Sequence, residues 1–130
     1  MKKLLLLILI LLSNICIAQS RVGSTEEEIK AEFWTDKYKA MSSYTDNKTY
    51  YISVKLERSL VIYYFTEKKV CYMTAIFPDT DGDLNAYVEY YNKQYVIISP
   101  TRWKMYNNNG FCNIELTYLE KSPPCFIWKD

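Results

Sequence analysis

Alternation of apolar and polar side chains is the feature that most limits what this chain can fold into. In residues 49–57, Tyr50, Ile52, Val54 and Leu56 alternate with mostly polar or charged residues. This period of two matches a β-strand, in which successive side chains point to opposite faces of a sheet. Segments rich in β-branched and aromatic residues predict five further strands, over residues 60–66, 70–77, 101–106, 111–118 and 124–128. The chain is therefore predicted to consist mainly of strands.

Two segments with helical periodicity each precede a group of strands. Ser24 is predicted to cap the first helix, with Glu27 as its capping-box partner, and apolar residues at helical spacing continue as far as Met41. The second helix is expected to begin just after Asp81 and to be followed by a short extended segment over residues 95–98. Polar turns over residues 67–69 and 107–110 predict two hairpins.

The same order of elements occurs twice along the chain. A helix followed by three strands fills residues 24–78, and a second such set fills residues 79–130. We therefore predict an α+β fold, built as a tandem αβββ duplication. Its strands form one antiparallel sheet, and its two helices pack on one face of that sheet. The other face is expected to be partly exposed and to carry Tyr51, Lys55 and Tyr63 as candidate binding residues.

Residues 1–18 have the layout of a secretory signal peptide that is cleaved before Gln19. Lys2 and Lys3 precede an apolar run over residues 4–12, and small residues lie near the expected cleavage site. This run is shorter than the ~20 residues that a membrane-spanning helix needs. A lipoprotein signal that retains Cys16 fits less well, because a bulky isoleucine precedes the cysteine. We expect a periplasmic or extracellular protein with one domain over residues 19–130 and no transmembrane segment.

Composition excludes several classes of function. Without Lys2 and Lys3, the 16 basic residues become 14 against 15 acidic ones, and they are interspersed, so a nucleic-acid partner is not expected. The chain contains no histidine, which rules out a serine–histidine or cysteine–histidine hydrolase. Cys71, Cys112 and Cys125 remain after cleavage; their pairing is left open, and buried structural thiols are the favoured interpretation.

One acidic cluster suggests a metal site. Asp79, Asp81 and Asp83 alternate around Gly82, and calcium binds oxygen ligands that a tight turn brings together. However, with Gly82 at the sixth position of a calcium loop, the first and twelfth positions hold no carboxylate. The alternative is a polar loop in which Asp81 or Asp83 caps the second helix. No other cofactor is predicted.

Two families share features with the chain. The segment from Gly23 to Ile29 resembles the glycine–x–threonine–helix opening of the SmpA/OmlA lipoproteins. The tandem helix-plus-sheet plan is similar to the β-lactamase-inhibitor-protein architecture. More broadly, segments such as Val70-Cys71-Tyr72 and Trp103-Lys104-Met105-Tyr106 resemble those of small exported bacterial proteins of unknown function. These resemblances imply an exported location and no particular activity.

The function predicted from the sequence is that of an exported, non-catalytic binding module. The 13 tyrosines supply aromatic area with a polar group, which suits a partner protein or a glycan, although core packing also accounts for them. The alternatives are a small enzyme that uses Asp or Glu chemistry, with or without calcium, and a structural accessory of an envelope assembly. A hydrophobic exposed edge strand would favour the last.

Overall fold

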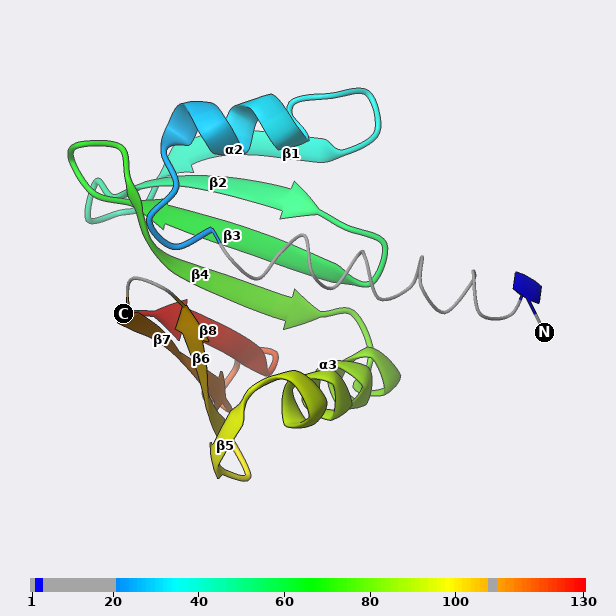
Figure 1. Ribbon diagram of the computed structural model, residues 1–130. Helices are drawn as coiled ribbons and strands as arrows, with labels where there is room; N and C mark the ends of the chain where they lie inside the picture. The colour runs from blue at the N-terminus through cyan, green and yellow to red at the C-terminus, as the bar shows by residue number, and fades with distance from the viewer. Residues whose placement is uncertain (1, 4–20, 108–109) are drawn as a thin grey trace.

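The computed structural model describes residues 2–3, 21–107 and 110–130. The predicted leader lies outside the described residues except for Lys2 and Lys3, as do Asn108 and Asn109 of the second predicted hairpin turn. Helix α2 (Glu26–Phe33) and helix α3 (Asp81–Gln94) are each followed by four strands (Figure 1). The strands are β1 (Lys39–Tyr44), β2 (Tyr50–Lys55), β3 (Ser59–Phe65), β4 (Cys71–Pro78), β5 (Val96–Ser99), β6 (Arg102–Asn107), β7 (Gly110–Thr117) and β8 (Cys125–Lys129).

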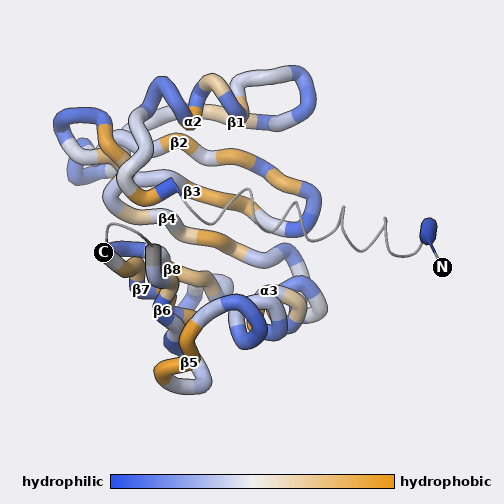
Figure 2. The backbone as a smooth tube through the Cα atoms, viewed as in Figure 1, coloured by the Kyte–Doolittle hydropathy of each residue, from blue (hydrophilic) through white to orange (hydrophobic). Residues whose placement is uncertain are grey.

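All eight strands belong to one antiparallel sheet with the order β1-β2-β3-β4-β8-β7-β6-β5. This sheet and the two helices confirm the predicted α+β class. Each of the six strands predicted from the sequence is present, with ends that differ by one or two residues. In Figure 2, hydrophobic stretches follow β2, β3 and β4, whereas the turns between these strands are hydrophilic.

Each helix is followed by four strands, so the predicted αβββ unit is wrong. The first helix ends at Phe33 and does not continue to Met41 as expected, and residues 39–44 form strand β1. The segment KAMSSY contains two serines and a tyrosine, which are weak helix formers. All six of its residues pair with β2, from Lys39↔Lys55 to Tyr44↔Tyr50, so pairing at the sheet edge overrides the helical spacing of the apolar residues.

Both helices begin at a threonine cap. Thr25 accepts a hydrogen bond from the Glu28 backbone N–H at 3.2 Å, and Thr80 accepts one from the Asp83 N–H at 3.1 Å. The cap is therefore Thr25 instead of the predicted Ser24, and neither Asp81 nor Asp83 caps the second helix. The predicted start of that helix near Asp81 is confirmed.

The two helices contact the same face of the sheet. The Phe33 ring of α2 stacks on Tyr63 of β3, with 5.8 Å between centroids, and Tyr91 of α3 contacts Trp128 of β8 at 5.6 Å. Tyr63 pairs with Thr74 and Thr74 pairs with Trp128, so these residues lie on one face. We call the opposite face, to which Tyr51 and Ile127 belong, the open face. Among the described residues, no helix is long and apolar enough to cross a membrane.

Tyr91 is the centre of the core in the second half. Its side chain is fully buried, and its ring lies 5.0–5.6 Å from those of Phe126, Trp103 and Trp128. The Trp128 indole N–H donates to the Tyr91 hydroxyl at 3.2 Å. Burial raises the pKa of Tyr91 well above its usual value, so the hydroxyl stays neutral. One side chain thus joins α3 to strands β6 and β8.

Replacement of Tyr91 tests this arrangement. We expect Tyr91→Ala to lower the free energy of unfolding by about 3–5 kcal/mol, because it empties a packed aromatic site. Tyr91→Phe should cost only about 1 kcal/mol, the value of one buried hydrogen bond. Urea unfolding of the wild-type chain and both variants measures these costs. Tyr118→Ala, at a side chain that is 64% exposed, is the control and should change little; equal losses at positions 91 and 118 would contradict the proposed core.

Candidate functional site

One row of paired residues crosses the open face from the first to the last strand of the sheet. Consecutive members are cross-strand partners, so their side chains stand next to one another on the same side. The row consists, in spatial order, of Ser43, Tyr51, Tyr64, Met73, Lys129, Asn113, Lys104 and Val96. We call it the open-face row.

The two ends of the open-face row differ in chemistry. In the first half, Tyr51 and Tyr64 are half-buried, with 6.2 Å between their ring centroids, and Met73 lies beside them. In the second half, Lys104 and Lys129 flank Asn113 and line a pocket of about 310 Å³. Tyrosine and methionine are residue types that protein interfaces favour. The row therefore combines an aromatic end with a basic end.

The open face as a whole carries more basic than acidic side chains. The strand register places one glutamate, Glu115, on this face, and Arg102 pairs with it at 3.5 Å. Lys104 lies over the Phe111 ring, with 4.3 Å from its ammonium to the centroid. The basic residues that the register places on this face are Lys39, Lys55, Arg102, Lys104 and Lys129. An anionic surface is the natural complement of this face.

The structure places two of the three predicted binding residues on the open face. Tyr51 belongs to the open-face row, and Lys55 lies on the same face, where its ammonium pairs with Asp79 at 2.6 Å. Tyr63 is instead fully buried under helix α2, so the expectation that it is exposed is wrong. Its hydroxyl has no hydrogen-bond partner among the described residues, and burial raises its pKa. The cause of the error is register, because Tyr63 pairs with Ile52 and not with Tyr51.

The three aspartates of the predicted calcium site have different partners. Asp79 pairs with Lys55, whereas Asp83 accepts a hydrogen bond from the Thr80 hydroxyl at 2.8 Å and lies 3.9 Å from Arg58. Asp81 is the first residue of α3, where the helix dipole stabilises a negative charge. The part of the chain that the structure describes holds no group of three metal-ligating side chains. Calcium binding there stays a prediction.

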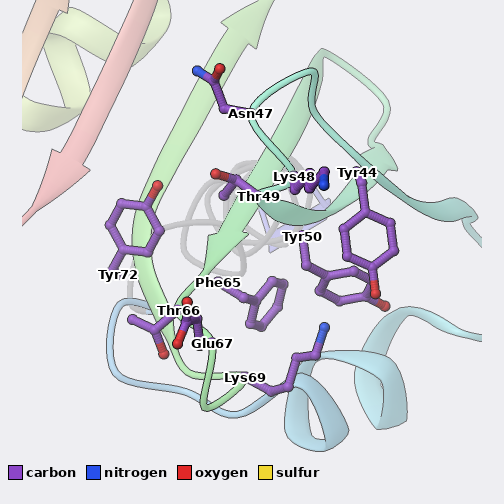
Figure 3. Close-up of a pocket in the computed structure, with 10 residues that line it drawn as sticks. All are labelled: Tyr44, Asn47, Lys48, Thr49, Tyr50, Phe65, Thr66, Glu67, Lys69 and Tyr72. Carbon is purple, nitrogen blue, oxygen red and sulfur yellow. The ribbon is translucent and has the colours of Figure 1, made fainter.

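A pocket of about 440 Å³ lies where the β1–β2 and β3–β4 turns meet, and we call it the turn pocket (Figure 3). Figure 3 shows Tyr72 on the side of the pocket opposite Tyr44 and Tyr50. The ring centroids of Tyr44 and Tyr50 are 5.3 Å apart, and those of Tyr50 and Phe65 are 5.5 Å apart. The polar lining residues are Asn47, Lys48, Thr49, Thr66, Glu67 and Lys69.

Lys69 fills part of the turn pocket with its own ammonium group. Its Nζ lies 3.7 Å from the centroid of Tyr50 and 5.3 Å from that of Tyr44, within the range of cation–π attraction. The Tyr50 hydroxyl donates to Glu26 of helix α2 at 2.9 Å, and Glu26 pairs with Lys30 at 2.7 Å. The hydrogen bond from Lys30 is the main cause that lowers the pKa of Glu26. Tyr50 is thus held from both sides.

Sequence reasoning did not identify the turn pocket. A first helix that continues as far as Met41 leaves no room for strand β1, and without that strand neither Tyr44 nor the β1–β2 turn is predicted to form a site. A usable signal is present in the sequence. Thr45-Asp46-Asn47-Lys48 and Thr66-Glu67-Lys68-Lys69 share the pattern of a threonine, an acidic residue and, three residues after the threonine, a lysine.

The three cysteines of the described chain are unpaired and buried. Burial raises the pKa of all three thiols, and that of Cys112 reaches about 11. Cys112 donates to the Lys129 carbonyl at 3.4 Å, and Cys71 to the Met73 carbonyl at the same distance. A protonated, enclosed thiol is a poor nucleophile. The favoured interpretation of these residues as buried thiols is confirmed.

Thiol labelling tests this environment. We expect Ellman's reagent to react slowly with Cys71, Cys112 and Cys125 of the folded protein at pH 8, because little thiolate forms there. The unfolding free energy should also fall as the pH rises from about 9 to 11, since the folded state then holds the Cys112 proton that the unfolded state has lost. Labelling in denaturant, where all three thiols should react at once, is the control. Rapid labelling of the folded chain at pH 8 would contradict the result.

No family model matches the chain, and no curated protein or solved structure matches it either. The resemblances to the SmpA/OmlA lipoproteins and to the β-lactamase-inhibitor-protein architecture therefore remain expectations from the sequence. The function proposed for the chain depends on its own residues and on the geometry of the open face.

Proposed function

We propose that the protein is an exported, non-catalytic binding module that holds an acidic partner protein on the open face of its sheet. The open-face row carries this proposal, because it joins an aromatic contact area to a basic one across all eight strands. Interface energy generally concentrates in a few central aromatic and cationic side chains. Tyr51 and Tyr64 supply the aromatic anchors, and Lys104 and Lys129 supply the charges that would orient an acidic partner.

Export is proposed from the leader pattern in residues 1–18. A non-catalytic role is favoured by the chemistry of the side chains. The chain has no histidine, its described thiols are buried, and two aspartates of its acidic cluster each face a basic residue. Recognition of a protein surface needs none of the activated groups that catalysis requires.

We also propose that the chain arose by tandem duplication of a helix-plus-four-strands unit. The support is threefold. Each helix precedes four antiparallel strands, and the sheet order is symmetric about the β4–β8 pair. Both helices start at a threonine whose hydroxyl accepts from the N–H three residues later. Lys69 and Lys121, in the last turn of each half, both have φ values near +60°, namely 61° and 62°.

Capture of a partner by the mature chain, residues 19–130, tests the proposed binding. We expect the wild-type chain to retain an acidic protein from the exported fraction of its own cells. The double variants Lys104→Glu/Lys129→Glu and Tyr51→Ala/Tyr64→Ala should each weaken retention by about tenfold or more, because they remove the two ends of the open-face row. Retention should also fall with added salt, since exposed charges are screened.

The matched control for charge is Lys93→Glu/Lys121→Glu, at exposed lysines of helix α3 and of the β7–β8 turn. It makes the same change in net charge away from the open face and should leave retention unchanged. Calcium and chelator arms test the acidic cluster at the same time. The proposal fails if no protein is retained, if both open-face variants retain the partner, or if the retained molecule is a nucleic acid.

A second function, as an assembly accessory that adds to another strand, is favoured by β5. This strand is at one end of the sheet, and Val96, Ile97 and Ile98 are 49%, 55% and 54% exposed. Figure 2 shows β5 as a hydrophobic segment. An exposed apolar edge strand is a template for pairing with a strand of another chain.

The edge strand can be tested by charge. We expect Ile97→Lys to abolish any self-association or co-assembly that proceeds through β5, because a lysine on an edge strand opposes further pairing. Sedimentation velocity of the wild-type chain and of Ile97→Lys, each with and without the captured partner, measures the assembly state. The control is Met41→Lys, which adds the same charge to β1, the edge strand at the opposite end of the sheet. Identical assembly of wild type and Ile97→Lys would exclude strand addition at β5.

A further inference from the structure

The turn pocket has a rigid rim because two turns of the same design form it. In the first, the Thr45 N–H donates to the Thr49 carbonyl at 2.9 Å and the Lys48 N–H to the Thr45 carbonyl at 2.8 Å. In the second, Thr66 and Lys69 make the equivalent bonds, to Val70 at 2.8 Å and to Thr66 at 2.9 Å. Each threonine hydroxyl also accepts from the N–H four residues later. The rim is thus set before any ligand arrives.

Both lysines hold the left-handed backbone conformation that their turns require. Lys48 has φ 63° and Lys69 has φ 61°, which is uncommon for a residue with a long side chain. Asparagine or glycine suits this conformation better. Lys121 has the same conformation but does not line the turn pocket, so turns of this kind accept lysine elsewhere in the chain. Lys48 and Lys69 differ from Lys121 in that they bring two ammonium groups to one pocket.

Aromatic rings form two separated walls of the turn pocket. Tyr44 is 60% exposed and Tyr72 is 42% exposed, whereas Tyr50 and Phe65 between them are buried. Figure 3 shows the Thr49 side chain between Tyr72 and Tyr50, and Asn47 at the upper edge of the pocket. A ring face paired with nearby amide, hydroxyl and charged groups suits a ligand that has an apolar face and a rim of hydroxyls.

The occupied position over Tyr50 argues against an organic cation as the ligand. Lys69 already places its ammonium there, and its backbone is fixed from two directions, by Thr66 and by the Glu26 N–H that donates to its carbonyl at 3.0 Å. A cationic ligand would have to displace the Lys69 ammonium, which belongs to the same chain and therefore has a high effective concentration over Tyr50. None of the ion pairs among the described residues involves Lys69, so its N–H donors are available to oxygen atoms of a ligand.

We propose that the turn pocket is a saccharide-binding site. Tyr44 and Tyr72 stack on the sugar rings, Lys69 and Lys48 donate to ring or hydroxyl oxygens, and Asn47 and Glu67 accept from the hydroxyls. The pocket volume of about 440 Å³ lies in the range of ~300–1,000 Å³ that small-molecule sites occupy. This site is formed by the turns at the end of the sheet, and none of its lining residues belongs to the open-face row.

Calorimetric titration of the mature chain with four named probes tests the proposal: cellobiose, maltose, N,N′-diacetylchitobiose and digalacturonate. We expect at least one to bind, and Tyr44→Ala and Tyr72→Ala each to weaken that binding by about tenfold, the effect of losing one stacked aromatic contact. Lys69→Asn keeps a residue suited to positive φ and removes the ammonium with its cation–π contacts to Tyr50 and Tyr44, so it should weaken binding while the protein stays folded. Digalacturonate, compared with the neutral sugars, reports whether a ligand carboxylate adds to the interaction with the lysines.

Two controls separate the ligand site from the fold and from the open face. Lys121→Asn makes the same change in the corresponding turn of the second half and should leave sugar binding unchanged. Tyr51→Ala/Tyr64→Ala should also leave it unchanged, although it weakens capture of the partner protein. The proposal is overturned if none of the probes binds, if binding survives both Tyr44→Ala and Tyr72→Ala, or if tetramethylammonium binds the wild-type pocket in place of the sugars.

Discussion

The structure depends on the pairing of β4 with β8, which joins the two halves of the sheet. The pair runs from Met73↔Lys129 to Ile76↔Phe126. On the helix-covered face it sets Thr74 beside Trp128, and Trp128 in turn contacts Tyr91 of α3. On the open face it sets Met73 beside Lys129, which joins the aromatic end of the open-face row to the basic end. Each half alone would be a domain of about 50–60 residues, a size at which burial of apolar surface barely offsets chain entropy.

Register at this pair and its neighbours decides which residues are available for function. Because side chains alternate, a shift of one residue would turn every buried side chain of a strand toward solvent. The aromatic contacts of Tyr63 with Phe33 and of Tyr91 with Trp128 hold the observed register on the covered face. The same register determines which side chains lie on the open face, so that face needs no apolar packing to fix it. This leaves Tyr51, Lys104 and Lys129 free to vary in chemistry, as a recognition surface requires.

The parts of this fold that the sequence predicts are those encoded by local patterns. Alternation predicts β2, richness in β-branched and aromatic residues predicts five further strands, and the start of α3 near Asp81 is also predicted. Strand β1 was missed because Tyr38 and Met41 also match a helical spacing, and only pairing with β2 decides between the two. The expected face of Tyr63 is wrong because it depends on the pairing of Tyr63 with Ile52 of β2, and the local sequence pattern does not determine that pairing. The turn pocket is not predicted for the same reason, since Tyr44, Phe65 and Tyr72 meet only after the four strands β1 to β4 have paired.

The symmetry of the sheet does not extend to the turn pocket, and the difference can be traced to one connection. Under the proposed duplication, the β1–β2 turn corresponds to the β5–β6 turn. The first contains Thr45 to Thr49 and brings Asn47 and Lys48 to the pocket, whereas the second has only Pro100 and Thr101 between its strands. The corresponding lysine of the last turn, Lys121, keeps the backbone conformation of Lys69 but has no such neighbouring turn. The open-face row needs both halves, and the turn pocket needs only the first. Damage to the second half should therefore remove partner binding before it alters the geometry of the turn pocket.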